Sequence, residues 1–272
     1  MPRLLLLLLL ASLPDVAQAW CQNTNVTVPL GGCRQRCAVE DDAVDARFLR
    51  LLWEDRDLTW VLAREGSRDL PRDQVIAIVD AAFTRWTGLT CEDHALRFDV
   101  SFDPEPSDDE VAVHRLLGPN ENQVLFDDEW VAHDHEPGAY AITATYYNTL
   151  TGEMLGADLE LNEERWTFAT CPPDGCSDGR VDLANTVTHE LGHFFGLAHT
   201  PESADATMWA CAAHGETLKR DLEPDDMAGM CALYGGHVEG GCGCAAPGAG
   251  RSNVPWVLGG LVLVAVLARR AR

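Results

Sequence analysis

Hydrophobic residues in the middle of the chain follow two periods, one typical of helices and one typical of strands. A stripe at helical spacing lies between Pro71 and Gly88 and consists of Val75, Ile76, Val79, Ala82, Phe83 and Trp86. Proline favours the first turn of a helix and glycine favours its end, so both boundaries agree with the spacing. The pattern predicts one long helix whose apolar stripe packs in the core.

Other segments alternate apolar and polar residues or form brief apolar runs, as strands do. Five segments have this character, and in chain order they are residues 58–62, 96–102, 123–126, 140–147 and 156–162. Gly152 turns the fourth of these segments into the fifth. The pattern therefore predicts five strands, four of them after the first long helix.

Two more helices are expected in the second half of the chain. Asp182 is the expected N-cap of a helix from residue 183 to about residue 195, because aspartate at this position accepts a hydrogen bond from the first turn. A last helix opens at Asp225 or its neighbour and ends near Tyr234. Together with the strands, these helices predict a mixed five-stranded sheet flanked by helices.

The helix expected from residue 183 carries the most specific motif in the chain, HELGHFFGLAH, which begins at His189. On a helix, His189 and His193 project from one face and can hold one cation. Gly196 can adopt the left-handed conformation that ends a helix, so the chain can turn back and bring in His199 as a third ligand. Glu190 lies beside the first ligand, where a carboxylate can act as a general base.

Three imidazoles and one carboxylate at this spacing indicate a catalytic zinc site. Three neutral imidazoles leave one tetrahedral position open, and water held there is acidified to a pKa of about 7. The alternative is a set of ordinary helix residues. It is disfavoured because a match of His, Glu, His, Gly and His at fixed positions has a chance on the order of 10⁻⁵ in such a chain. We therefore predict Zn²⁺ as the cofactor and hydrolysis as the reaction.

The motif has the extended pattern HExxHxxGxxH, through which the chain resembles the metzincin clan of zinc endopeptidases. Metzincins carry a methionine turn beneath the zinc, and Met208 in ATMWA, nine residues after His199, is the candidate. A core methionine that fills a gap is the alternative. Within the clan, GADLELN and LEPDDMAGMCALYG resemble segments of the matrixins, whereas Thr200 departs from their usual serine. No PRCGxPD motif is visible, so the latency mechanism of vertebrate matrixins is not carried over.

The resemblance implies an α+β fold: a metzincin-like (zincin) catalytic domain with a mixed, mostly parallel five-stranded sheet, long helices, and a zinc cleft between an upper and a smaller lower subdomain. It also implies that an edge strand, here within residues 139–147, pairs with the extended main chain of a protein or peptide substrate. Ala141, Thr143 and Thr145 are the expected substrate-binding positions on this strand. The pocket just past the scissile bond would draw its walls from residues 209–218.

The start of the chain predicts a targeting segment. Residues 1–19 combine a short basic start, a leucine run and the small-residue site Ala17-Gln18-Ala19, which indicates a secretory signal peptide. A membrane anchor is the alternative, but the run is short for a bilayer. Residues 20–56 then form a cysteine-containing N-terminal segment, and residues 57–236 form the matrixin-like catalytic domain.

The end of the chain predicts a second targeting segment. Residues 237–253 form a Gly/Cys/Ala linker and tag, and residues 254–272 form a hydrophobic segment with a basic end. This order resembles the MYXO-CTERM sorting tags of some Gram-negative bacteria, in which Cys242 or Cys244 would mark the processing or lipid-attachment point. A plain C-terminal anchor is the alternative. We expect export through the Sec pathway and attachment to the cell surface or outer membrane, with the anchoring or sorting machinery as partner.

Ten cysteines in an exported chain indicate disulfides. We expect Cys171 to pair with Cys176 across a short loop and Cys211 to pair with Cys231. Four cysteines would then pair among themselves: Cys21, Cys33, Cys37 and Cys91. Zinc binding by these thiols is disfavoured because none shows paired CxxC spacing, and a free Cys33 or Cys37 that caps the zinc is a further alternative.

The chain has 20 basic and 43 acidic residues and a formal charge of −23. This charge argues against nucleic acid or an anionic membrane surface as partner. Calcium is an additional candidate cofactor, because acidic runs at residues 103–110, 127–136 and 221–226 offer hard oxygen ligands. Solvated loops are the alternative, and no run has an EF-hand pattern. The His-Asp-His segment at residues 133–135 could hold a second metal, although a solvent-facing loop is favoured.

Three functions from different classes fit these observations. We favour a secreted or surface-attached zinc endopeptidase, expected as a monomer, in which Glu190 activates the zinc-bound water. A catalytically inactive metal-binding surface module is disfavoured, because such a module has no use for Glu190 beside an intact ligand set. A structural envelope protein would leave Met208 and the ligand spacing unexplained.

Overall fold

The computed structural model of the chain describes residues 21–22, 49–92, 94–109, 111–113, 120–201 and 203–235. The chain divides into two compact units, Met1–His237 and Val238–Arg272, and every described residue belongs to the first. The predicted signal peptide, tag and hydrophobic C-terminal segment lie outside the described residues. None of the helices within the described ranges has the length and apolar character that a bilayer crossing requires.

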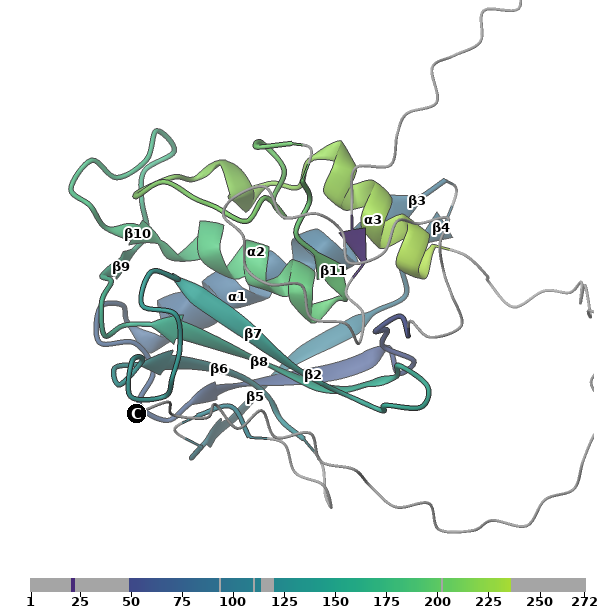
Figure 1. The fold of residues 1–272 in the computed structure, drawn as a ribbon, viewed down its shortest axis with the longest axis horizontal. Coiled ribbons are helices and arrows are strands. Elements are labelled where there is room, and N and C mark those ends of the chain that lie inside the picture. Colours follow the sequence, from purple (N-terminus) through teal and green to yellow (C-terminus); the bar gives the residue numbers. More distant parts are fainter. Residues whose placement is uncertain are drawn as a thin grey trace, which may run out of the picture. The chain divides into compact units, whose positions relative to one another are not determined.

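A five-stranded sheet forms the frame of the fold (Figure 1). The strand order is β5-β2-β6-β8-β7, and the respective bounds are Asp99–Ser107, Asp57–Ala63, Asn122–Asp127, Met154–Asn162 and Ala141–Tyr147. Neighbouring strands are parallel except for β7, which pairs antiparallel with β8. The predicted α+β fold with a mixed, mostly parallel sheet is therefore confirmed, and β7 stands at one edge of it.

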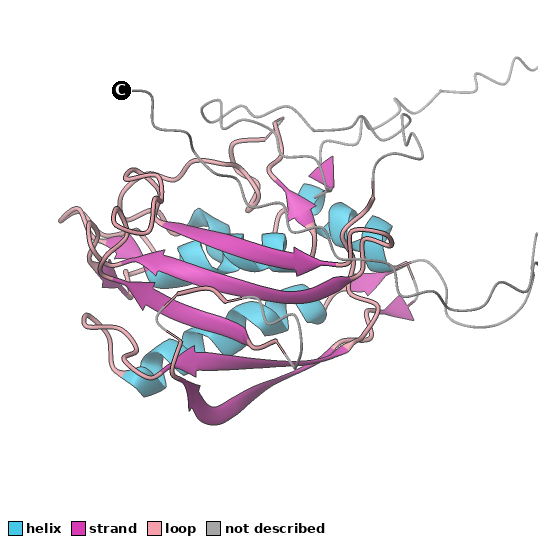
Figure 2. Ribbon diagram, turned by 60° about the horizontal axis from the view of Figure 1, so that its bottom comes forward, coloured by secondary structure: helices cyan, strands magenta, loops and turns pink. Residues whose placement is uncertain are grey.

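Helices cover one face of this sheet (Figure 2). The longest is α1 (Arg72–Thr87), and it buries the predicted stripe at Val75, Val79, Ala82, Phe83 and Trp86, whereas Ile76 of the same stripe is only partly buried. Two indole groups join the core to α2 (Leu183–Phe194): Trp86 Nε1 donates to Thr188 O at 2.8 Å, and Trp53 Nε1 donates to Phe194 O at 2.7 Å. Each fully buried large side chain of this kind contributes on the order of 2 kcal/mol. The core thus fixes the helix that carries the motif.

Short strand pairs join the loops around this core. They are antiparallel β1 (Cys21–Gln22) with β11 (Leu197–Ala198), antiparallel β3 (Thr90–Cys91) with β4 (His94–Ala95), and parallel β9 (Phe168–Ala169) with β10 (Val181–Asp182). The hydrophobic pattern did not predict these pairs, because two residues are too few to show alternation. The β1–β11 pair brings the N-terminal segment next to the strand that precedes His199.

Strand β5 begins and ends later than residues 96–102, the predicted range. It continues through Pro104 and Pro106 to Ser107. Proline lacks an N–H group and is tolerated mainly in edge strands, and β5 is an edge strand that pairs only with β2 among the described residues. The prolines therefore hid the second half of the strand from the sequence pattern.

The disulfides agree with one predicted pair and contradict another. Cys171 pairs with Cys176, as expected. Cys231 pairs with Cys91 rather than Cys211, so Cys91 does not pair with the cysteines of the N-terminal segment. The end of α3 (Pro224–Tyr234) packs against β3, and a β-carbon on Gly235 would lie 2.8 Å from Cys91 Cβ. Cys211 is also disulfide-bonded, but not to Cys231.

Candidate active site

Helix α2 begins where the sequence predicts, after Asp182. The Asp182 carboxylate accepts hydrogen bonds from Asn185 N at 2.7 Å and from Cys171 N at 2.9 Å. Arg220 Nε, in the short helix η1 (Leu218–Arg220), donates to the same carboxylate at 2.8 Å. These bonds satisfy the first turn and fix the start of the helix. His189 and His193 then follow four residues apart on one face.

A glycine lets the chain turn back after α2. Gly196 has a φ of 91°, in the left-handed region, as predicted. A β-carbon at this position would also lie 2.4 Å from Leu51 O, so a larger residue would meet the main chain of another segment. Strand β11 follows at once, and His199 comes directly after it. The turn therefore brings the third histidine back toward the helix.

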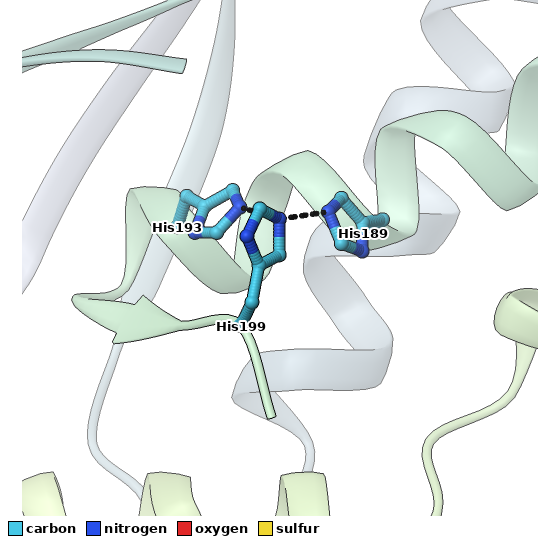
Figure 3. A group of neighbouring side chains, drawn as sticks. All are labelled: His189, His193 and His199. Carbon is cyan, nitrogen blue, oxygen red and sulfur yellow. Dashed lines mark hydrogen bonds between the residues drawn. The ribbon is translucent and has the colours of Figure 1, made fainter. Parts of the chain in front are cut away.

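The three histidines of the motif point toward one another (Figure 3). Nε2 of His199 lies 3.1 Å from Nε2 of His189 and 3.1 Å from Nε2 of His193. Two imidazole nitrogens bound tetrahedrally to one zinc ion, at about 2.0–2.1 Å each, lie about 3.3 Å apart. The observed separations therefore fit the ligands of one such ion.

Hydrogen bonds to the main chain decide which nitrogen of each ring carries the proton. His189 Nδ1 donates to Thr207 O at 2.6 Å, and His193 Nδ1 donates to Leu197 O at 2.8 Å. In a neutral ring, this arrangement leaves the lone pair on Nε2. Burial, with the neighbouring rings, lowers the pKa of His189 and of His199, the latter to about 3, and burial alone lowers that of His193. Neutral rings whose lone pairs converge repel one another unless a cation lies between them, so the donor set fits a divalent metal.

Glu190 lies beside these rings and has only 5% of its surface exposed. Its Oε2 accepts a hydrogen bond from the Thr143 hydroxyl at 2.7 Å. Burial raises the pKa of Glu190 to about 7, and the bond from Thr143 partly offsets this rise. A carboxyl group with a pKa near neutrality can accept a proton and release it again, which general acid–base catalysis requires.

The turn at Met208 contacts both the first histidine and helix α2. The main-chain nitrogens of Met208 and Thr207 donate to the two carboxylate oxygens of Asp226, at 3.0 and 2.8 Å. Thr207 O accepts the hydrogen bond from His189 Nδ1. The Met208 side chain is buried against Gly192 of α2. Met208 thus packs directly against the helix that carries two of the histidines.

Comparisons with known proteins relate the sequence of this chain to one family. Residues 52–235 match the sequence model of the Matrixin family. The chain belongs to the matrixin family. It is similar to Metalloendoproteinase 1-MMP of Arabidopsis thaliana, with 27% identity over 186 residues, and to Matrilysin of Homo sapiens, with 28% identity over 206 residues. The alignments cover 67% and 74% of this chain, and 44% and 66% of the respective relatives.

Another relative, Metalloendoproteinase 5-MMP of Arabidopsis thaliana, is 29% identical over 199 residues, which cover 71% of this chain and 47% of the relative. The chain therefore spans about half the length of the two Arabidopsis relatives. Matrixins are zinc-dependent metalloproteases, and the described part of this matrixin contains a three-histidine group that fits the metal.

Strand β7 of this matrixin runs beside α2 at the edge of the sheet. Ala141, Thr143 and Thr145 alternate along the strand and share one face. Thr143 contacts Glu190, Ala141 is buried, and Thr145 is partly exposed. Sequence reasoning placed Thr143 on this strand but missed its bond to Glu190. The alternation shows which residues share a face, and it does not show what lies opposite them.

A second group of metal-binding side chains lies apart from the three histidines of the motif. Donor atoms of Asp127, His135 and Glu160 lie within 4.8 Å of one another. His133 Nδ1 also lies 2.8 Å from Asp127 Oδ2. The carboxylates of Asp127 and Glu160 are both buried. Residues 133–135 lie in a loop with Asp134 exposed, as expected, whereas His133 and His135 are partly buried against the buried carboxylates of Asp127 in β6 and Glu160 in β8. Asp127 and Glu160 were missed as partners because they come from separate strands.

Proposed function

We propose that this matrixin is a zinc-dependent endopeptidase that hydrolyses peptide bonds of protein substrates. The convergence of three Nε2 atoms beside a buried, oriented carboxylate carries the proposal. A structural zinc site has no need of such a carboxylate, whereas a hydrolytic site does. An inactive metal-binding module or a structural envelope protein would leave Glu190 without a role.

His189, His193 and His199 would hold the metal through Nε2. A zinc ion in this position supplies Lewis-acid activation of water and of the scissile carbonyl group. Glu190 accepts the proton of the attacking water and passes it to the leaving amine. The main-chain acceptors Thr207 O and Leu197 O keep two of the rings in the tautomer that presents Nε2.

The substrate would bind in extended form along β7. Its other edge is already paired with β8, and within the described ranges no strand pairs with the edge that faces α2. Main-chain hydrogen bonds to such an edge give affinity with little sequence selectivity. Ala141, Thr143 and Thr145 are the proposed substrate-binding positions on this strand.

The segment after Met208 contacts the residue that precedes β7, the strand along which the substrate would bind. The Tyr140 hydroxyl, just before β7, lies 3.4 Å from Ala212 O and 3.2 Å from His214 Nδ1. The rings of Tyr140 and Trp166 also pack edge to face, at 5.1 Å between centroids. This contact supports residues 209–218 as the wall of the pocket that selects a substrate side chain.

Export and surface attachment belong to the same proposal. Two disulfides among the described residues support an oxidising compartment. The proposed signal peptide, residues 1–19, and the proposed sorting segment, residues 254–272, would carry a monomeric enzyme to the cell surface or outer membrane. Its substrates would then be proteins outside the cell.

Calcium belongs to the proposal as an additional cofactor. Apart from the three histidines, Asp127, His135 and Glu160 are the one group in the described part of the chain where three metal-binding side chains converge. Asp127 and Glu160 offer the carboxylate oxygens that calcium takes, whereas the imidazole of His135 is a ligand typical of zinc and other transition metals. Equilibrium dialysis against calcium, with Glu160→Gln as the control, would show whether this group binds it.

A peptide-library digest tests the proposed activity. The zinc-loaded protein beginning at Trp20 should cleave internal bonds, and Glu190→Gln should retain zinc and lose at least the roughly 10²- to 10⁴-fold that a general base supplies. Full activity of Glu190→Gln would refute the role of this residue. A wild-type protein that binds zinc and cleaves nothing would favour the binding module instead.

A further inference from the structure

We propose that Thr143 is a positioning residue for Glu190, because its hydroxyl group holds the carboxylate of the general base in a fixed orientation. The proposal rests on the proposed function and deepens it. Thr143 is placed by the edge strand β7, and Glu190 is placed by α2, 47 residues later in the chain. Their contact joins the strand along which a substrate would bind to the helix that carries the base and two metal-binding histidines.

The Thr143 hydroxyl lies close to two acceptors of the same residue. Its Oγ1 is 2.7 Å from Glu190 Oε2 and 3.1 Å from Glu190 O. A hydroxyl group has one proton to donate. The main-chain oxygen is at the longer distance, and a distance of about 2.5–2.7 Å is typical of an O–H donor on an ionised carboxylate. The proton therefore goes to Oε2 and ties the carboxylate to β7.

Burial makes this bond the main restraint on the carboxylate. Glu190 is 5% exposed, and within the described ranges Thr143 donates the only hydrogen bond to its side chain. A buried carboxylate strongly favours an orientation in which it meets a donor. One donor on Oε2 therefore fixes the plane of the carboxyl group, and Oε1 is then the oxygen that can take the proton from water.

The other residues of β7 show that this contact is specific to position 143. Ala141 has no polar side chain, and Thr145, on the same face, makes no hydrogen bond to α2 in the described structure. Tyr146 lies on the opposite face, where its hydroxyl donates to Asp158 at 3.2 Å. Thr143 is thus the residue of β7 whose side chain reaches the base.

Two substitutions separate the hydroxyl group from the shape of the side chain. Thr143→Val keeps the branched shape and removes the donor, whereas Thr143→Ser keeps the donor. We expect Thr143→Val to lower kcat by about 10- to 100-fold, as loss of a positioning contact does, with little change in KM because the main chain of β7 is retained. Thr143→Ser should restore most of the lost kcat. Thr59→Val is the matched control, because Thr59 is an exposed threonine of β2 in the same sheet, and it should keep wild-type kinetics.

A double-mutant cycle provides a readout that does not depend on activity. The free energy of unfolding of the zinc-loaded protein is measured for wild type, Thr143→Val, Glu190→Ala and the double variant. Because the two side chains share a hydrogen bond, the double variant should lose less stability than the sum of the two single losses. Additive losses would contradict the contact.

The outcomes distinguish this inference from the proposed function. A Thr143→Val variant with wild-type kcat, or one that raises KM alone, would overturn the positioning role while the wild-type activity stands. An inactive wild-type protein would overturn the proposed function, and the unfolding cycle would still report on the contact. Should Thr143→Val fail to fold, Thr143→Ala removes the same hydroxyl group and carries the same expectation.

Discussion

The sulfur atom of Met208 occupies the space that a β-carbon on Gly192 would need. An ideal β-carbon at Gly192 would lie 2.1 Å from Met208 Sδ and 3.0 Å from Trp86 Cζ2. Gly192 stands between Glu190 and His193 on α2, so the methionine reaches the helix at the level of the metal-binding rings. Glycine at this position lets the turn after the third histidine support the helix directly.

Gly192→Ala should therefore destabilise the protein even though alanine favours helices. Overpacking of a filled core costs about 1–3 kcal/mol, which exceeds the gain of about 1 kcal/mol in helix propensity. Thermal unfolding and a zinc competition titration should show a lower melting temperature and weaker zinc binding. Gly138→Ala is the control, because its β-carbon would have no neighbour closer than 3.8 Å. A second substitution, Met208→Ala, should recover part of the loss, and a fully additive double variant would count against the contact.

The disulfide between Cys91 and Cys231 should stabilise the fold far more than the one between Cys171 and Cys176. The sequence separations are 140 and 5 residues, and the chain-entropy model gives about 5 and about 2 kcal/mol for such loops. Denaturant unfolding measures the loss of stability in two double variants, Cys91→Ala/Cys231→Ala and Cys171→Ala/Cys176→Ala, each of which lacks one disulfide. Equal losses in the free energy of unfolding would show that the length of the closed loop does not determine how much each disulfide stabilises the fold.

Asp158 should make the stability of the protein depend on pH. Burial raises the pKa of this carboxyl group to about 6 from an ordinary value of 3.8, although Gln123 N and Val113 N donate to it. Because the pKa is higher in the folded state, the contribution of Asp158 is favourable below about pH 4 and is lost as the pH rises through 6.

Asp158→Asn cannot titrate, so it should gain stability relative to wild type as the pH rises. A pKa difference of about two units corresponds to a free energy on the order of 3 kcal/mol. The free energy of unfolding of Asp158→Asn, relative to that of wild type, should rise by this order between pH 4 and pH 7. Urea unfolding at several pH values measures this difference. A constant difference across that range would contradict the assigned pKa.

The features that the sequence predicted depend on residues close together in the chain. The stripe of α1, the cap at Asp182 and the turn at Gly196 each involve a few neighbouring positions, and the structure agrees with all three. The positions of two histidines on α2 and of the third directly after β11 also follow from local spacing.

The features that the sequence did not predict depend on contacts between segments that are distant in the chain. Nothing near Cys91 indicates a partner 140 residues away. The bond from Thr143 to Glu190 requires the position of the whole sheet relative to α2. The prolines of β5 are allowed only because that strand lies at an edge, which is a property of the assembled sheet.

X-ray absorption at the zinc edge, together with elemental analysis, tests the central claim most directly. Wild-type protein loaded with zinc should bind about one ion more than His199→Ala, and the wild-type spectrum should show three imidazole nitrogens and one oxygen ligand at about 2.0–2.1 Å. Sulfur ligands in that spectrum, or equal zinc content in wild type and His199→Ala, would contradict the assignment of His189, His193 and His199 as the metal site.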